Sequence, residues 1–115
     1  MPVRIYHNPR CSKSRATLEL LRERGIEPEI THYLEDPPSM QELSSILDML
    51  GCGPRELMRS GEPEYAEQGL DDPSLSRNDL IAAMVATPKL IERPIVLANG
   101  KAAVGRPPES VLEIL

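Results

Sequence analysis

The segment VRIYHNPRCSKS, residues 3–14, decides the fold. Residues 3–7 alternate apolar and polar side chains and are rich in β-branched and aromatic types, which predicts a strand. An Asn-Pro pair then breaks the strand, and a helix is expected over about residues 12–24, ended by a glycine. Residues 28–34 are a second strand candidate. Strand, helix and strand in this order predict a βαβ unit with a parallel pair of strands.

The middle of the chain, over about residues 39–88, is expected to be a helical insert. Ser39 and Ser76 each precede an acidic residue three positions on, the pattern of a helix-capping box. Apolar side chains follow each serine at helical spacing, and the first of these helices is expected to end at Gly51. Shorter helical pieces are expected over residues 54–69.

The end of the chain predicts a β-hairpin and a last helix. Residues 94–98 and 101–104 form the two antiparallel strands, joined at Asn99-Gly100, a strong hairpin turn. The last helix is expected to turn inward the apolar side chains Val111, Leu112 and Leu115. Together these elements predict one α/β domain over residues 1–115, ordered β-α-β, helical insert, β-β-α, with a mixed sheet.

The composition excludes several classes of protein. The 115 residues include 13 Lys or Arg and 18 Asp or Glu, a net charge of −5 that argues against nucleic-acid binding. Phe and Trp are absent, so the aromatic side chains on which the bases of single-stranded nucleic acid would stack are missing as well. No apolar run is long enough to cross a bilayer. With two cysteines and no apolar signal segment, the expected location is a reducing cytoplasm.

Cys11 is the first candidate for chemistry, because it lies between the first predicted strand and helix. Backbone N–H groups and the positive end of the helix dipole at this position lower a thiol pKa. Arg10, Lys13 and Arg15 add positive charge, with no acidic residue over 7–15. A basic thiol in an acidic chain suits a small anionic substrate. The alternative is a buried structural thiol, which the basic neighbours argue against.

Two polar residues near Cys11 have open roles. Cys11-x-x-Ser14 has the spacing of a redox C-x-x-C motif with serine in place of the second cysteine, so turnover would need an external thiol. Ser14 could donate to the thiolate or a substrate oxygen, or bond to its own helix backbone. His7 could polarise the thiolate as an imidazolium, or be a hydrogen-bonded histidine at a strand end. No His and Cys spacing matches a zinc site.

Two Arg-Pro steps, Arg93-Pro94 and Arg106-Pro107, flank the predicted hairpin. Because its strands are antiparallel, both arginines are expected at the same end, where two guanidiniums could grip a tetrahedral oxyanion. An X-Pro bond has an accessible cis form, and a cis turn at Pro94 would present backbone beside the thiol. Arg59 could supply a third guanidinium from the insert, although its spacing alone does not distinguish it from a surface charge.

Five segments of the chain resemble the ArsC family, closest to its short YfgD-type branch. They are HNPRCSKSR (7–15), YLEDPP (33–38), RELMR (55–59), ERPIV (92–96) and GRPPE (105–109). The resemblance implies a thioredoxin-like fold and an arsenate reductase coupled to glutaredoxin. Some members of the family carry a cysteine just before the arginine that corresponds to Arg106, where this chain has Gly105.

The resemblance also implies residue roles. Cys11 would attack arsenate, His7 would help to hold it as a thiolate, and Ser14 would hydrogen-bond at the site. The arginines that the resemblance implies as oxyanion ligands are Arg59, Arg93 and Arg106. Pro94 would be the cis-proline of the thioredoxin fold. Glutathione would act as co-substrate, As(V) would be reduced to As(III), and glutaredoxin would remove the glutathionyl group. No bound cofactor and no metal is implied.

Two other functions stay open on the sequence. An Spx-like regulator that binds RNA polymerase belongs to the same superfamily, but such proteins typically use a C-x-x-C switch, which Ser14 interrupts. A monothiol reductase of glutathione mixed disulfides, or of another oxidised substrate, is the other alternative, because the basic site also fits the carboxylates of glutathione. Cys52 matches no catalytic position and is interpreted as structural.

Overall fold

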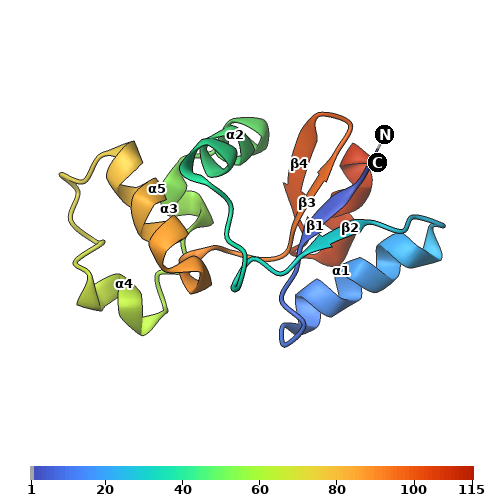
Figure 1. Ribbon diagram of the computed structural model, residues 1–115, viewed down its shortest axis with the longest axis horizontal. Helices are drawn as coiled ribbons and strands as arrows, with labels where there is room; N and C mark the ends of the chain where they lie inside the picture. Colours follow the sequence, from blue (N-terminus) through green and yellow to red (C-terminus); the bar gives the residue numbers. More distant parts are fainter. Residues whose placement is uncertain (1) are drawn as a thin grey trace. The chain divides into compact units, whose positions relative to one another are not determined.

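The computed structural model describes residues 2–115, which form two compact units (Figure 1). Unit 1 comprises the chain up to Asp36 together with residues 93–115, and unit 2 comprises residues 37–92. The predicted helical insert falls within unit 2. None of the helices in residues 2–115 has the length and apolar character needed to span a membrane.

Unit 1 is built on a four-stranded mixed sheet in the order β2-β1-β3-β4. Its strands are β1 (Arg4–Tyr6), β2 (Glu29–Thr31), β3 (Ile95–Ala98) and β4 (Lys101–Val104). β1 runs parallel to β2, as the βαβ pattern predicted, and β3 is antiparallel to both β1 and β4. The central position of β1 appears in its register, because Ile5 pairs with Ile30 on one side and Val96 on the other. The class is therefore mixed α/β, as predicted.

The hairpin of β3 and β4 turns at Asn99 and Gly100, whose φ angles are 55° and 73°. Two positive φ angles in succession are typical of the type I′ turn that Asn-Gly favours. Ile95 pairs with Val104 at the other end of the hairpin. The residues just outside this pair therefore come close together, and they include Arg93 and Arg106.

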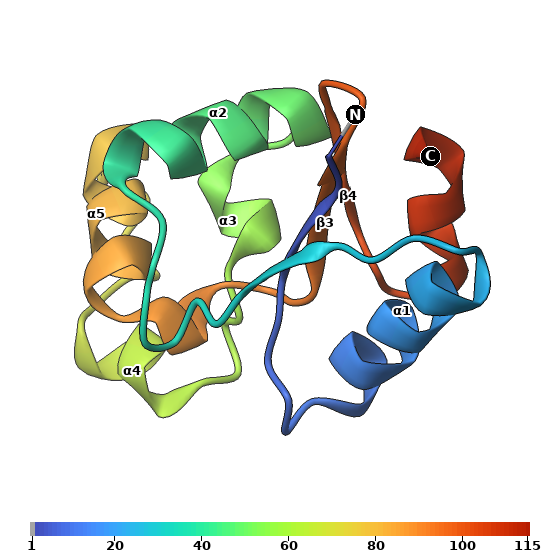
Figure 2. The same ribbon diagram turned by 45° about the vertical axis from the view of Figure 1, so that its right-hand side comes forward.

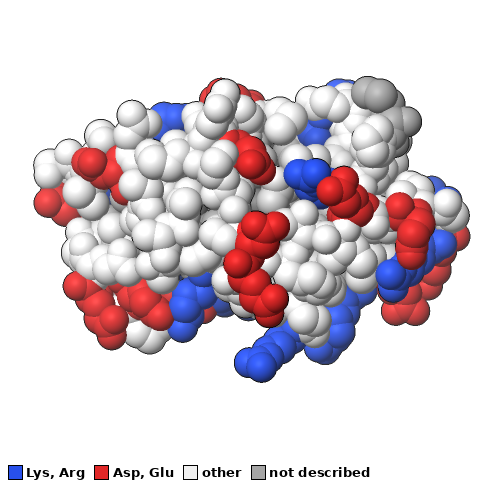
Figure 3. All heavy atoms as spheres, in the orientation of Figure 1, with Lys and Arg blue, Asp and Glu red and all other residues white. Residues whose placement is uncertain are grey.

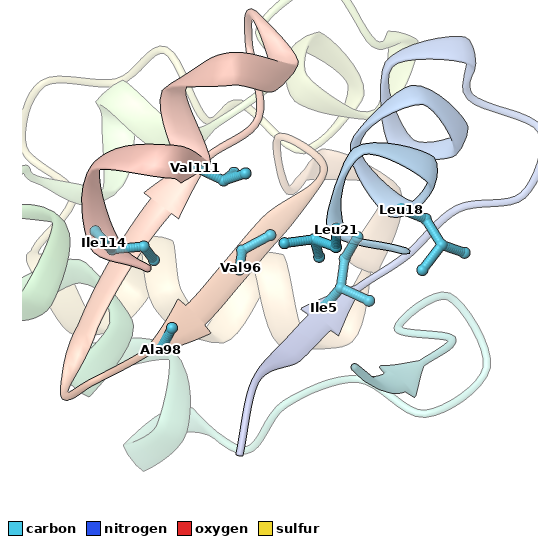
Figure 4. Packing of buried hydrophobic residues seen from close by; sticks show 7 residues of the cluster. All are labelled: Ile5, Leu18, Leu21, Val96, Ala98, Val111 and Ile114. Carbon is cyan, nitrogen blue, oxygen red and sulfur yellow. The ribbon is translucent and has the colours of Figure 1, made fainter. Parts of the chain in front are cut away.

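Helix α1 (Ser12–Glu23) and the 3-10 helix η2 (Pro108–Ile114) pack against each other and against the sheet (Figure 2). Between them lies an aliphatic core (Figure 4), which comprises Ile5, Leu18, Leu21, Val96, Ala98, Val111 and Ile114. The aliphatic character of this core agrees with the absence of Phe and Trp from the chain. The core packs α1 against the sheet through Leu18 and Leu21, and Cys11 lies at the start of this helix.

The last helix, η2, is a 3-10 helix, whereas the expected burial of Val111, Leu112 and Leu115 corresponds to α-helical spacing. A 3-10 helix has three residues per turn, so Val111 and Ile114 share one face and both are buried. Leu112 is only half-buried and Leu115 is exposed. The prediction that Leu115 faces inward was wrong, because in this geometry the fourth residue after Val111 rotates away from the core.

Unit 2 is helical. Its elements are α2 (Met40–Leu50), α3 (Pro54–Leu57), α4 (Pro63–Glu67), α5 (Arg77–Ala86) and the 3-10 helix η1 (Pro88–Leu90). α5 packs against α2, α3 and η1. The predicted caps are present: the Ser39 hydroxyl accepts the Glu42 N–H at 3.1 Å, and Gly51 ends α2 with φ 69°. Ser76 and Asp79 form a capping box at α5.

Candidate active site

Cys11 is the N-cap residue of α1, with extended backbone angles of φ −94° and ψ 122°. Its N–H donates to the carbonyl of Asn8 at 3.0 Å, and its carbonyl accepts the N–H of Arg15 at 3.0 Å. These two bonds fix a tight turn between β1 and α1. The side chain is 7% exposed and is not part of a disulfide. It lies at the positive end of a helix whose first turn contains no acidic residue.

The surroundings of the Cys11 sulfur favour its ionised form. Burial alone would raise the pKa of the thiol. The backbone N–H of Ser14, the charge and hydrogen bond of Arg93, and the backbone N–H of Lys13 outweigh burial, so the pKa is lowered. Nη2 of Arg106 lies 3.7 Å from Sγ, within hydrogen-bond reach of sulfur. Two guanidiniums therefore reach one nearly buried sulfur, the environment of a nucleophilic thiolate.

A hydrogen bond joins the side chain of Arg106 to the backbone of Arg93. Nε of Arg106 donates to the carbonyl of Arg93 at 2.8 Å, and the N–H of Gly105 donates to the carbonyl of Pro94 at 2.9 Å. The Arg93–Pro94 and Arg106–Pro107 peptide bonds are both cis. The antiparallel register placed these arginines at one end of the hairpin, and the structure brings both to the sulfur.

The side chains of Ser14 and His7 are hydrogen-bonded to each other. Ser14 is fully buried, and its Oγ accepts the N–H of Asn8 at 3.0 Å and lies 2.6 Å from Nδ1 of His7. Within residues 2–115 these are the hydrogen bonds of the Ser14 side chain, and neither runs to Cys11. Ser14 therefore ties the end of β1 to the first turn of α1.

His7 is 6% exposed, and its environment favours the neutral imidazole. Burial, and then positive charge from His32 and two nearby arginines, lowers the pKa of His7. The hypothesis of an imidazolium beside the thiolate is therefore disfavoured. The described contacts of the ring are with Ser14 and with the ring of His32, whose centroid lies 6.0 Å away.

Positive charge gathers on the surface around this turn. Arg10, Lys13 and Arg15 are all exposed. Figure 3 shows blue side chains at the lower edge of unit 1, where Figure 1 places the start of α1. The approach to the sulfur in unit 1 is therefore basic, as the local sequence predicted.

Arg59 belongs to unit 2 and lies in a charged cluster there. Its guanidinium pairs with the carboxylate of Glu62, and its Nε lies 3.7 Å from Oε1 of Glu92. Lys89 pairs with Glu62 at 3.7 Å and with Glu64 at 2.9 Å. The backbone N–H of Arg59 donates to the carbonyl of Leu90 at 2.8 Å, so the residue is held at both ends within its own unit.

The comparison with known proteins decides the family. The sequence pattern of the ArsC family matches residues 6–114. The chain belongs to the ArsC family. It is 60% identical to the uncharacterized protein YfgD of Escherichia coli K12 over an alignment of 114 residues. This alignment covers 98% of this chain and 96% of YfgD. It is 53% identical to an arsenate reductase of Neisseria meningitidis serogroup B, over 98% of this chain and 97% of that relative.

The solved structures agree with this assignment. A structure described as the arsenate reductase from Vibrio cholerae superposes with a TM-score of 0.97 at 55% identity, covering 100% of this chain and 98% of that one. A putative arsenate reductase from Yersinia pestis gives a TM-score of 0.94, also at 55% identity, over 97% and 99% of the two chains. The thioredoxin-like fold that the resemblance implied is thus confirmed.

One feature of this ArsC chain was not visible in its sequence. Thr17 is fully buried one helical turn after Ser14, and its Oγ1 donates to the carbonyl of Lys13 at 2.8 Å. A Cβ built on Gly105 would collide with this Oγ1 and would lie 2.8 Å from Cγ of Pro94. A side chain at the position just before Arg106 would therefore require Thr17 and Pro94 to shift.

The remaining thiol and histidine lie in ordinary surroundings. Cys52 is half-buried, and burial together with the charge of Glu56 raises its pKa, which favours the neutral thiol. His32 is exposed at the end of β2. Within the described part of the chain no group of three or more His, Cys, Asp or Glu is placed to hold a metal ion.

Proposed function

We propose that this ArsC chain reduces arsenate to arsenite, with glutathione as co-substrate and a glutaredoxin as partner. The observation that carries the proposal is the sulfur of Cys11, which is nearly buried, has a lowered pKa and lies within reach of Arg93 and Arg106. Arsenate is a small tetrahedral oxyanion, the kind of substrate that paired guanidiniums bind. The names of the relatives at 53% and 55% identity support the choice of arsenate.

In the first step of the proposed cycle, the Cys11 thiolate attacks As(V). A sulfur–arsenic bond forms, and one arsenate oxygen takes up protons and leaves as water. Arg93 and Arg106 bind the remaining oxygens and offset the negative charge that builds up on them. Arg59 is proposed as a third oxyanion ligand on the strength of the family resemblance.

In the second step, the glutathione thiolate attacks the adduct. The electron pair of the sulfur–arsenic bond passes to arsenic, As(V) becomes As(III), and Cys11 is left in a disulfide with glutathione. Two thiols have together lost the two electrons that arsenic gained. A glutaredoxin thiolate then removes the glutathionyl group by exchange, and Cys11 returns as a thiolate.

The chain's composition at the site supports the need for an external thiol. Ser14 occupies the position of a second cysteine, and Gly105 supplies no thiol beside Arg106. Ser14 and His7 act in this scheme as positioning residues that hold the turn carrying Cys11. The reaction needs no bound cofactor or metal, and it fits a reducing cytoplasm, where glutathione is maintained.

The test is arsenate-dependent loss of NADPH in a mixture of the full chain, glutathione, glutathione reductase and glutaredoxin. We expect turnover by the wild-type chain and by Cys52→Ser, and none by Cys11→Ser, because a hydroxyl is a far poorer nucleophile at this site. A glutathionylated peptide replaces arsenate in a parallel assay. Turnover of the peptide with no turnover of arsenate would replace the proposal by the monothiol reductase.

A further inference from the structure

Unit 1 contains a cavity of about 370 Å³ beside the turn that carries Cys11. One wall is the β1–α1 turn and the other is the chain just after β2. The lining residues are His7, Asn8, Pro9, Arg10, His32, Leu34 and Glu35. A volume of this size lies at the lower end of the range for small-molecule sites. None of the steps proposed above assigns a role to this cavity.

The two walls of the cavity present unpaired charges of opposite sign. Within residues 2–115, the guanidinium of Arg10 and the carboxylate of Glu35 make no hydrogen bond or ion pair, although both side chains are exposed. Each comes from a different wall. A ligand that carries both a carboxylate and an ammonium group would satisfy both charges at once.

The rest of the lining suits a short peptide. Leu34 is 43% exposed, and it offers an apolar surface to methylene groups. The ring centroids of His7 and His32 lie 6.0 Å apart, with 59° between the ring planes, and both rings line the cavity. The cavity therefore combines an anion contact, a cation contact and an apolar surface.

The cavity is directly connected to the nucleophile through the backbone. Arg10 is the residue before Cys11, and the carbonyl of Asn8, another lining residue, accepts the Cys11 N–H. A tripeptide spans roughly 10 Å when extended. A peptide bound between Arg10 and Glu35 would therefore lie along the turn that carries Cys11.

We propose that this cavity binds the reducing peptide thiol, with a ligand carboxylate at Arg10, its ammonium group at Glu35 and its methylene groups on Leu34. The ligand class is a short zwitterionic peptide, of which glutathione is an example. This assignment rests on the proposed function for its role in turnover, although the binding itself does not. The oxyanion and the thiol would then be bound by separate groups, the oxyanion by Arg93 and Arg106.

The experiment is titration of the full chain with S-methylglutathione, followed by NMR of the backbone amides. The methylated sulfur cannot reduce the site, so binding is measured apart from chemistry. We expect Arg10→Gln and Glu35→Gln each to weaken binding by about three- to fivefold, the upper part of the range for an exposed charge contact. Arg24→Gln and Glu19→Gln remove the same charges from exposed positions on or next to α1 and should leave binding unchanged.

The kinetic counterpart separates this inference from the proposed function. In the coupled assay, Arg10→Gln and Glu35→Gln should raise the KM for glutathione by the same factor, and Glu35→Gln should leave the KM for arsenate unchanged. Arsenate turnover with unaltered glutathione KM in both variants would overturn the cavity assignment while the arsenate proposal stands. No binding of S-methylglutathione to the wild-type chain would also overturn it. Binding that depends on both charges, in a chain that does not reduce arsenate, would support the cavity and refute the function.

Discussion

Replacement of Arg106 by methionine removes a positive charge near the sulfur of Cys11 while keeping a long side chain. Nη2 of Arg106 lies 3.7 Å from Sγ. At this separation a unit charge contributes about 4 kcal/mol with an effective dielectric of about 20, and about 1 kcal/mol in bulk water. Cys11 is nearly buried but Arg106 is exposed, so the effect lies between these limits. We expect the pKa of Cys11 to rise, because the thiolate loses a stabilisation of between about 1 and 4 kcal/mol.

The assay is the rate of thiol alkylation against pH, measured in a Cys52→Ser background so that one thiol titrates. Arg106→Lys should keep most of the pKa depression, because it keeps the charge, but should weaken arsenate binding, because it loses the planar fork. Arg24→Met is the control, since Arg24 is exposed beyond the last residue of α1. An alkylation profile of Arg106→Met that matches the wild type would refute the electrostatic reasoning.

Three further predictions follow from the packing and protonation of unit 1. Gly105→Ala should lower the free energy of unfolding in urea by about 1–3 kcal/mol, since the new Cβ meets Thr17; an equal midpoint would contradict the contact. Ser14→Ala should cost about 1–3 kcal/mol in the same measurement, because the half-buried N–H of Asn8 and an imidazole nitrogen of His7 lose their partner. The lowered pKa of Cys11 implies stability that is present above the unfolded pKa and lost as pH falls through the folded one. The stability of the wild type relative to Cys11→Ser should therefore increase as pH rises toward the unfolded-state pKa of about 8.5, and a difference independent of pH would rule this out.

Features that depend on neighbouring residues were predictable from the sequence. The cap of α2 needs only Ser39 and the N–H three residues later, and the hairpin needs only Asn-Gly between two strand segments. The meeting of Arg93 and Arg106 followed from the same hairpin, because antiparallel strands return the chain to its starting edge. The position of Cys11 at the start of α1 required no more than the order of strand and helix.

Features that depend on packing between distant segments were not predictable. The fit of Gly105 against Thr17 joins the end of the hairpin to α1, and no local pattern in either segment encodes it. The bond between His7 and Ser14 was not distinguishable from a contact with Cys11, because both residues lie near the same turn. Burial then set the protonation of His7, and burial is a property of the folded chain.

The close approach at Gly105 also constrains how this protein could change over evolution. A single codon change from glycine to cysteine is simple in genetic terms, yet here it would force a side chain into space already filled by Thr17 and Pro94. The residue at 105 is thus coupled to the residue at 17, although the two lie 88 positions apart in the sequence. A redesign that places a thiol at 105 should therefore also replace Thr17 by a smaller residue.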